Sequence, residues 1–360
     1  MIEEGHTFVI AEVGVNHNGS LQLALELVEI AARAGADAVK FQTFSSEKLV
    51  SAHTPKAAYQ IASTGKDGNQ LEMLRALELP HAAYRALAAR CRELGIAFMS
   101  TAFDLDSLRF LAGFDMPATK IASGDVTAAP LVLEAARIGR PIILSTGMCT
   151  LEDVQEALGV IAFGLTNPAV RPAPAAFERA YASQAGRAAL VEKVTLLHCV
   201  TEYPARFDEV NLRAMDVLRT EFGLRVGYSD HTLGTSVALA AVARGATTIE
   251  KHFTLDRTLP GPDHRASLEP GELHGLVQGI REIEAALGIA RKEPSQAELS
   301  NQRVARRSLV TTRAIRRGEL FDADNLAVKR PGIGRRPVHY WTVLGTPANR
   351  DYAADEILEP

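Results

Sequence analysis

The stretch MSTAFDLDSLRFLAGFDMPATKIASGDVTAAPLVLEAARIGRPIILSTGM (99–148) contains the same structural unit three times. Each time an apolar, strand-like run ends in a short polar cluster and a helix-like segment follows; the run ends are MSTAF (99–103), KIASGD (120–125) and LSTGM (144–148). Five more such ends lie elsewhere: IAEVGVNHNG (10–19), VKFQTF (39–44), LLHCVTEYP (196–204), GYSDHT (227–232) and EKHFTLD (250–256). Eight units predict a (β/α)8 TIM barrel, in which all strand ends open onto one face.

The boundaries of the predicted strands follow from these runs. We expect strands near 8–14, 38–44, 96–103, 118–125, 141–148, 194–200, 225–231 and 248–255. The first helix is expected to begin after the capping residue Ser20, to repeat apolar residues with helical period, and to end at Gly35.

The length of the chain predicts a second domain. Its 360 residues exceed the roughly 250 of a plain barrel by about a hundred. After the last barrel helix, near 270–288, the sequence changes to short β-like runs with Gly and Pro turns. We therefore predict a barrel at 1–288, a polar linker at 289–303 and a small β-rich domain at 304–360.

Two connections are longer than a regular barrel requires. Residues 45–79 follow the second predicted strand on the catalytic face, where a long polar connection could lean over a ligand as a lid. Residues 164–191 lengthen the connection that precedes the sixth strand, on the opposite face. We interpret them as a helical insertion for stability or association, without a catalytic role.

Composition excludes several classes of protein. No apolar run approaches the ~18 to 20 residues of a membrane span, and the N-terminal MIEEGHTFVIAEVG does not look like a signal peptide, so we expect a cytoplasmic protein that does not bind membranes. Cys91, Cys149 and Cys199 are odd in number and are expected to be reduced packing residues. A net charge of −4 provides no electrostatic footprint for nucleic acid.

Two histidines at the ends of neighbouring strands suggest a metal site. His231 ends the seventh predicted strand and His252 lies near the end of the eighth. Strands about 4.8 Å apart would let both imidazoles share one ion. Two histidines with oxygen donors suit an exchangeable ion similar to Mn²⁺ better than a closed structural zinc site. The alternative is a pair of hydrogen-bonded core histidines.

Two lysines lie in strands that should be largely buried, where an unpaired ammonium is costly. Lys40 and Lys120 each need an anion, and the surrounding small residues could donate to phosphate or carboxylate oxygens: Ser100, Thr101, Ser123, Ser145, Thr146, Gly147 and Ser229. We favour an anionic substrate. The alternative is that the lysines pair with barrel carboxylates such as Glu12 or Asp125.

A few polar residues could belong either to the site or to the scaffold. Glu12 is the best candidate for a base or a hydroxyl-binding carboxylate, although it could equally be a structural partner of Lys40. The weaker candidates are His17, Tyr203, Asp230 and Asp263.

The motifs as a set resemble the bacterial sialic acid synthases, a family that includes legionaminic acid synthases. The resemblance extends through IAEVGVNHNGS, GADAVKFQTF, STAFD, KIASGD, PIILSTGM, LLHCVTEYPA, VGYSDHTLG, IEKHFTLD and GPDH. RRSLV and VKRPGIG resemble the family's C-terminal antifreeze-like (SAF, β-clip) domain. The family condenses phosphoenolpyruvate with an N-acylated mannosamine-type sugar to give a nine-carbon 2-keto acid.

The resemblance implies a role for each matching residue. His231 and His252 would bind the divalent metal, most often Mn²⁺, with Mg²⁺ and Co²⁺ as alternatives. The residues expected to hold phosphoenolpyruvate are Lys40, Thr101, Lys120, Ser123, Ser145 and Ser229. Those expected around the acceptor sugar are Gln42, Glu12, Tyr203, Asp263 and Arg330, the last supplied by the SAF domain of the partner subunit in a domain-swapped homodimer.

The resemblance also implies a mechanism. The metal would polarise the aldehyde of the open-chain sugar, C3 of phosphoenolpyruvate would attack it, and water would add at C2 before phosphate leaves by C–O cleavage. Glu12, together with Asp125, would manage the protons. Asp125 departs from the family pattern, which often has Glu there, and Val200 stands where a polar residue is common.

Two acceptors fit the resemblance. N-acetylmannosamine would give N-acetylneuraminate, which we rank slightly ahead, and 2,4-diacetamido-2,4,6-trideoxymannose would give legionaminate. Two other classes of function are a metal-dependent lyase on the same barrel and a non-catalytic carbohydrate-binding protein. Retention of both lysines and both histidines argues against the second of these.

Overall fold

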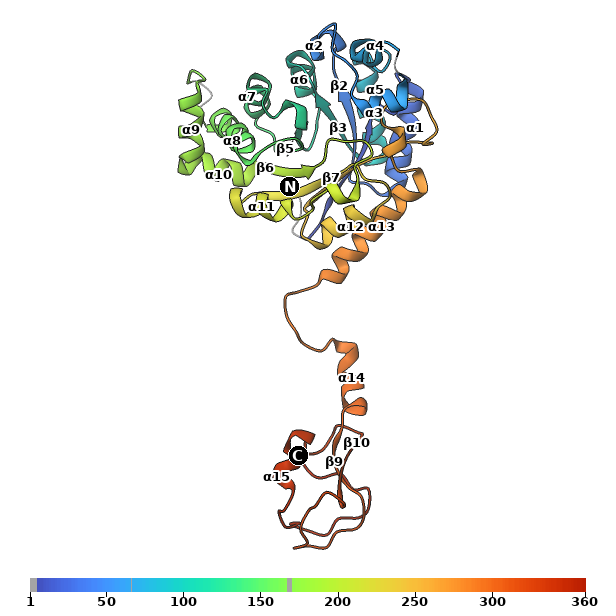
Figure 1. Ribbon diagram of the computed structural model, residues 1–360, viewed down its shortest axis with the longest axis vertical. Helices are drawn as coiled ribbons and strands as arrows, with labels where there is room; N and C mark the ends of the chain where they lie inside the picture. Colours follow the sequence, from blue (N-terminus) through green and yellow to red (C-terminus); the bar gives the residue numbers. More distant parts are fainter. Residues whose placement is uncertain (1–4, 66, 167–169) are drawn as a thin grey trace. The chain divides into compact units, whose positions relative to one another are not determined.

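The computed structural model describes residues 5–65, 67–166 and 170–360. The chain divides into two compact units, Met1–Gly288 and Ile289–Pro360. In the first unit eight parallel strands form a closed barrel in sequence order, with helices around it (Figure 1). The predicted TIM barrel is therefore confirmed.

The strands occur where the apolar runs predict them. They are β1 (Phe8–Gly14), β2 (Ala38–Thr43), β3 (Ala97–Ala102), β4 (Thr119–Ile121), β5 (Ile142–Ser145), β6 (Val194–Cys199), β7 (Arg225–Asp230) and β8 (Thr248–His252). Strands β4 and β5 end earlier than predicted. Beyond β4 the chain turns into the short 3₁₀ segment η1 (Ser123–Asp125), in which the backbone N–H of Asp125 donates to the carbonyl of Ala122 at 3.0 Å.

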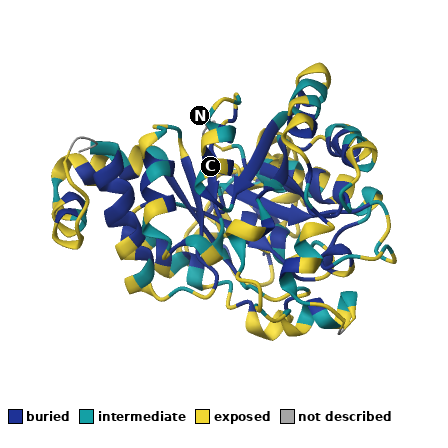
Figure 2. Ribbon diagram, turned by 90° about the horizontal axis from the view of Figure 1, so that it is seen from above, coloured by how far each residue is buried: buried dark blue, intermediate teal, exposed yellow. Residues whose placement is uncertain are grey.

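Helices follow the strands and form the outer layer. They are α1 (Leu21–Ala34), α5 (His81–Leu94), α6 (Leu105–Ala112), α7 (Ala129–Arg137), α8 (Leu151–Thr166), α11 (Ala214–Phe222), α12 (Ser236–Ala243) and α13 (Pro270–Leu287). Helix α1 begins and ends as predicted, because the Ser20 side chain accepts from Leu23 N–H and Gly35 adopts a left-handed conformation with φ of 82°. Figure 2 shows the buried strands inside helices with exposed outer faces.

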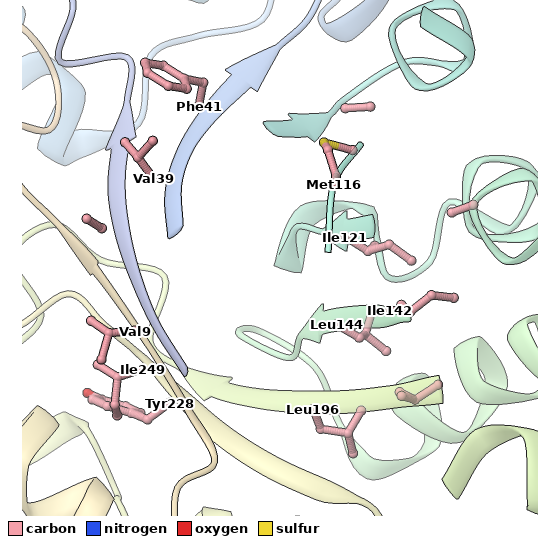
Figure 3. Close-up of a cluster of buried hydrophobic side chains, with 14 of the residues drawn as sticks. Val9, Val39, Phe41, Met116, Ile121, Ile142, Leu144, Leu196, Tyr228 and Ile249 are labelled. Atoms are coloured by element: carbon pink, nitrogen blue, oxygen red, sulfur yellow. The ribbon is translucent and has the colours of Figure 1, made fainter. Parts of the chain in front are cut away.

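The core has two layers, one on each side of the strands. Alternate residues such as Val9, Tyr228 and Ile249 face outward and pack beneath the helices, and they lie together in Figure 3. The intervening positions face the barrel interior, where a smaller cluster fills its centre: Ile10, Ala38, Met99, Ala118, Ile143 and Leu197. The interior is therefore packed, and open space for chemistry is left at the carboxyl ends of the strands.

Strand register places several of the predicted polar residues beside one another on neighbouring strands. Glu12 is paired with Lys40 on β2 and with His252 on β8. Thr101 is paired with Lys120 on β4, and Ser229 on β7 with Glu250 on β8. Since neighbouring strands are about 4.8 Å apart, this register places charged groups from distant parts of the sequence within direct contact.

The two long connections are both helical. Residues 45–79, predicted as a polar connection, contain α2 (Ser46–Leu49), α3 (Ala58–Thr64) and α4 (Gln70–Arg75). Residues 164–191 contain the end of α8, then α9 (Pro174–Ala182) and most of α10 (Gln184–Lys193); 167–169 lie outside the described residues. Helix α9 packs closely on α8, because Gly159 leaves the Phe177 carbonyl only 3.1 Å from where a Cβ would be.

The second unit has its own small core. Strands β9 (Ser308–Thr311) and β10 (Leu326–Lys329) form an antiparallel pair, and η4 (Pro337–His339) leads into α15 (Tyr340–Val343). The core residues are Leu309, Ile315, Phe321, Leu326, Val343, Ala348, Tyr352 and Leu358. Part of the segment predicted as a linker, 289–303, is instead helical, since α14 (Gln296–Ala305) starts there with Ser295 as its N-cap. No helix in the described parts of the chain is long and apolar enough to cross a membrane.

Candidate active site

One cavity of about 330 Å³ lies at the carboxyl ends of the strands. It is lined by every barrel residue that the family resemblance assigns to the site except Asp125: Glu12, Lys40, Gln42, Thr101, Lys120, Ser123, Ser145, Tyr203, Ser229, His231, His252 and Asp263. The candidates Ser100, Thr146 and Gly147 are not among the lining residues. Asp125 lies just beyond, in η1, with its pKa raised to about 6 by burial. Arg330 belongs to the second unit, which is described separately.

A cluster of four buried charges forms the floor of this cavity. The Lys40 Nζ lies 2.7 Å from Glu12 Oε2 and 3.5 Å from Glu250 Oε2. The Lys120 Nζ lies 3.5 Å from Glu250 Oε1. Both lysines therefore have carboxylate partners. The carboxylate that they share is Glu250, whereas the sequence analysis had considered Glu12 and Asp125 as partners. All four side chains are at most 6% exposed.

Hydroxyl groups complete the floor. Lys40 donates to Thr101 Oγ1 at 3.1 Å, Lys120 donates to Ser145 Oγ at 2.8 Å, and Ser229 Oγ donates to Glu250 at 2.9 Å. Glu250 is the central residue that the sequence prediction missed. The available signal was its place in EKH, two residues before His252 and so on the same face of β8.

The two carboxyl groups of the floor differ in pKa although they share a lysine. Burial raises the pKa of Glu12 to about 7, an effect that Lys40 opposes without cancelling. Burial would also raise the pKa of Glu250, but Lys120 and Lys40 together outweigh it and hold the value at about 2. Burial would lower the pKa of Lys40, but Glu12 and Glu250 outweigh it and raise the value, whereas burial lowers the pKa of Lys120. Near neutral pH the floor thus carries the Lys40 ammonium, one full carboxylate and one carboxyl that can gain or lose a proton. Two lysines in this closed space suit an anionic ligand, which would favour the charged form of Lys120.

The two histidines lie side by side, with ring centroids 5.6 Å apart. The Nδ1 atom of His231 is 2.5 Å from the Val200 carbonyl, which fixes it as the protonated nitrogen and leaves Nε2 with a free lone pair. The His252 Nδ1 is buried and has no hydrogen bond within the described chain, and Asp263 Oδ2 is 3.9 Å from it. Burial lowers the pKa of His231 to about 4 and that of His252 well below its ordinary value.

These features fit an exchangeable divalent ion. Neutral, buried imidazoles with available nitrogens are suitable ligands. Across residues 5–65, 67–166 and 170–360, no group of three or more His, Cys, Asp or Glu is placed to hold a metal. His231 and His252 thus offer two nitrogen donors, and a bound ion would need further ligands such as oxygen atoms of substrate or water.

Aromatic residues enclose the same end of the cavity. The Tyr203 ring stacks on His231 at 4.1 Å, and Tyr59 of α3 lies 5.1 Å from Tyr203. The helical segment after β2 thus contributes to the cavity wall, as the lid prediction anticipated, although Tyr59 was not singled out. Burial raises the pKa of the Asp263 carboxyl, which also lines the cavity, to about 7.

A second buried ion pair lies on the opposite side of the two histidine-bearing strands. Lys251 Nζ contacts Asp230 Oδ2 at 2.8 Å, and both side chains are 0% exposed. Asp230 also accepts from the Thr232 N–H at 2.9 Å and from its hydroxyl at 2.8 Å. Because Asp230 and Lys251 each precede a histidine, the pair fixes the ends of β7 and β8 from behind. Asp230 therefore lies in the scaffold, and so does His17, whose Nδ1 accepts from Gly19 N–H.

The comparison with known families is consistent with this geometry. Residues 27–292 match the NeuB family, and residues 306–360 match the SAF domain. The chain belongs to the NeuB family. The prediction of an enzyme of the nonulosonate synthase kind, with a C-terminal SAF domain, is confirmed.

Individual relatives refine the comparison. The chain is 45% identical to the N,N'-diacetyllegionaminic acid synthase of Campylobacter jejuni, over 98% of both chains. It is 42% identical to the enzyme of that name from Legionella pneumophila, over 98% of this chain and 93% of that one. The solved N-acetylneuraminic acid (sialic acid) synthetase of Leptospira borgpetersenii is 32% identical, with a TM-score of 0.66 over 82% of this chain and 90% of that one.

Breaking the Lys251–Asp230 pair from one side should destabilise the barrel strongly. Lys251→Met leaves a buried carboxylate without its partner, so we expect a loss of about 3 to 5 kcal/mol in the free energy of unfolding. The double variant Asp230→Asn/Lys251→Met removes both charges and should be the more stable of the two. Urea unfolding followed by circular dichroism measures the free energy of unfolding of both variants.

A Lys251→Met protein as stable as wild type would contradict the structural role of this ion pair. The control is Arg206→Met, which removes an exposed pair with Asp208 and is expected to change the free energy of unfolding little.

Proposed function

We propose that this chain condenses phosphoenolpyruvate with 2,4-diacetamido-2,4,6-trideoxymannose to form N,N'-diacetyllegionaminate and phosphate. The reaction type is supported by the buried Lys40–Glu12–Glu250–Lys120 floor beside the paired histidines. The acceptor is supported by the 45% and 42% identity to two legionaminic acid synthases, against 32% to the sialic acid synthetase. The order in which the sequence analysis ranked the two acceptors is thereby reversed.

Phosphoenolpyruvate would bind on the charged floor. Its phosphate and carboxylate need cationic and hydroxyl donors, and Lys40 and Lys120 are already within hydrogen-bonding distance of Thr101 and Ser145. Ser123 and Ser229 line the same cavity and extend the donor set. Since the floor is almost completely buried, these charge-assisted contacts act with little screening by solvent.

The carbon–carbon bond forms between C3 of phosphoenolpyruvate and the aldehyde carbon of the open-chain sugar. The aldehyde oxygen takes up a proton and becomes a hydroxyl group, and water adds at C2. As the C2–O bond to phosphate breaks, the added water gives up its two protons, one to replace the proton on the new hydroxyl group and one to the departing phosphate, which leaves the 2-keto acid. Glu12 is the residue best placed to hold a transferred proton, because its pKa of about 7 lets it act in both directions. Asp125 lies just outside the cavity lining, and its role in proton transfer stays a prediction.

His231 and His252 would hold a divalent ion, most simply Mn²⁺, with Mg²⁺ or Co²⁺ as alternatives. When bound, the ion supplies Lewis-acid activation of the acceptor's carbonyl oxygen. Gln42, Tyr203 and Asp263 would surround the acceptor. Arg330 would reach this acceptor from the SAF domain of a partner subunit, in a domain-swapped homodimer.

A panel of acceptor sugars tests the proposed function directly. Purified protein is incubated with phosphoenolpyruvate, Mn²⁺ and either N-acetylmannosamine or 2,4-diacetamido-2,4,6-trideoxymannose, and phosphate release and product mass are followed. We expect a higher kcat/KM with the diacetamido sugar. Efficient turnover of N-acetylmannosamine alone would show that the acceptor is wrong, whereas phosphate release without any acceptor would favour the lyase alternative.

Lys120→Ala should weaken phosphoenolpyruvate binding selectively. Loss of one charge-assisted contact of about 1.5 to 3 kcal/mol predicts an affinity roughly 10- to 150-fold lower, with the acceptor KM nearly unchanged. Calorimetric titration with phosphoenolpyruvate measures the effect, and Lys292→Ala, at an exposed position, is the control. Wild-type affinity in the Lys120 variant would refute the assigned contact.

His252→Ala should abolish tight Mn²⁺ binding while the barrel stays folded. Of the two neutral nitrogen donors, one is removed, and among the described residues no group of three or more His, Cys, Asp or Glu is placed to hold a metal instead. Electron paramagnetic resonance of free Mn²⁺ during titration reports binding independently of turnover. If the variant binds Mn²⁺ as wild type does, the metal lies elsewhere.

Mixed dimers test whether the SAF domain acts in trans. Arg330→Ala and Glu12→Ala are each expected to inactivate the homodimer. After subunit exchange, one of the two composite sites in a heterodimer has both residues intact, so activity should reappear. Persistent inactivity, with exchange verified by mass spectrometry, would exclude the domain-swapped arrangement.

A further inference from the structure

One wall of the active-site cavity is apolar, in contrast to its charged floor. Val15, Met73, Leu74, Leu77 and Phe103 all line the cavity. They also pack against one another in a single hydrophobic cluster, separate from the main core, which Phe44 and Leu49 complete. The wall is therefore a continuous surface, and three of its residues come from the helical segment between β2 and α5.

The charged floor and the apolar wall come from different parts of the chain. The floor residues lie within strands, and their positions are fixed by the register of the barrel. Met73, Leu74 and Leu77 lie on α4 or directly after it, outside the barrel strands. Leu77 is 7% exposed, while Met73 and Leu74 are half-buried and so keep part of their surface open toward the cavity.

Two glutamine side chains lie close to this wall and also line the cavity. Gln60 Oε1 accepts from the Ala57 N–H at 2.8 Å and from Gln70 Nε2 at 3.3 Å, and its own Nε2 is 3.4 Å from the Tyr59 hydroxyl. The Gln60 amide is thus engaged with Ala57, Gln70 and Tyr59 inside the segment, and the aliphatic side chains remain the surface that the wall offers a ligand.

The floor determines which end of the acceptor meets the wall. The aldehyde carbon must reach phosphoenolpyruvate on the lysine floor, so the carbons at the other end of the sugar extend away from the strands. A hydroxyl group that is buried against aliphatic side chains loses its water without gaining a partner, which is unfavourable. A methyl group in the same place gains from burial.

We propose that this wall selects an acceptor whose distal carbon is deoxygenated, with a methyl group at C6 packed against Met73, Leu74 and Leu77. The inference rests on the proposed function, and it assigns acceptor choice to the α3–α4 segment and bond formation to the strands. Met73, Leu74 and Leu77 are thus specificity-determining residues that take no part in proton transfer or phosphate binding.

Two acceptors that differ by a single oxygen atom test the inference. Wild-type kcat/KM is measured for 2,4-diacetamido-2,4,6-trideoxymannose and for 2,4-diacetamido-2,4-dideoxymannose, which has a hydroxyl at C6. We expect the 6-deoxy sugar to be preferred by about 10- to 100-fold, the range over which an apolar pocket discriminates against an added hydroxyl.

Substitutions within the wall identify its contribution. Met73→Gln keeps the length of the side chain and adds a hydrogen-bonding group, so the preference for the 6-deoxy sugar should fall several-fold while the KM for phosphoenolpyruvate is unchanged. Met73→Leu, which keeps the wall apolar, should retain the preference. Leu74→Gln provides an independent position if the first variant is poorly folded.

The outcomes separate the two proposals. If neither diacetamido sugar is a substrate but N-acetylmannosamine is, the proposed function fails. If both diacetamido sugars are turned over equally well, or if Met73→Gln and Leu74→Gln both fold and keep the wild-type preference, the proposed function stands and the apolar wall does not select at C6.

Discussion

The structure of the site depends on the contact between Lys40 and Glu12, which Glu250 extends to Lys120. Four ionisable side chains in a space almost closed to water are tolerated only because each has a partner of opposite charge. The barrel makes this possible, since register places Glu12 beside Lys40 and the strands β4 and β8 bring Lys120 and Glu250 to the same cavity. Burial raises the pKa of Glu12 to about 7, whereas at Glu250 Lys120 and Lys40 outweigh burial and hold the pKa at about 2. One site thus contains both a proton carrier and a fixed counter-charge.

The sequence was most informative where a side chain's role follows from its position in a strand. Alternating apolar runs predicted all eight strands, and strand ends predicted which polar residues share a cavity, because parallel register leaves few alternatives. Spacing from His252 places Glu250 on the same face of β8, but Glu250 was missed because its contacts with Lys40 and Lys120 cross the barrel and do not follow from spacing along the chain. Asp125 was assigned to the site by the family resemblance; the chain turns at η1, where Ser123 lines the cavity and Asp125 lies just beyond it. The sequence of residues 45–79 predicts the short helices there only weakly, since helices of this length depend on packing against the rest of the protein.

Reaction and specificity are physically separable in this architecture. The floor and the histidines lie on strands whose ends are fixed from behind, for β7 and β8 by the Lys251–Asp230 pair. Three wall residues, Met73, Leu74 and Leu77, lie in a helical segment outside the strands, where changes of side chain do not disturb strand register. A family that performs one chemistry on several amino sugars can therefore vary the wall while it keeps the floor. This division agrees with relatives that share the barrel and are named for different nonulosonic acids.

The most direct test of the account is a crystal structure of the protein with phosphoenolpyruvate and Mn²⁺, with the ion located by its anomalous scattering. The account predicts a phosphate or carboxylate group of the ligand within about 3 Å of the ammonium nitrogens of Lys40 and Lys120, and the ion between His231 and His252. Phosphoenolpyruvate bound elsewhere, with both lysines still engaged only by Glu12 and Glu250, would contradict it.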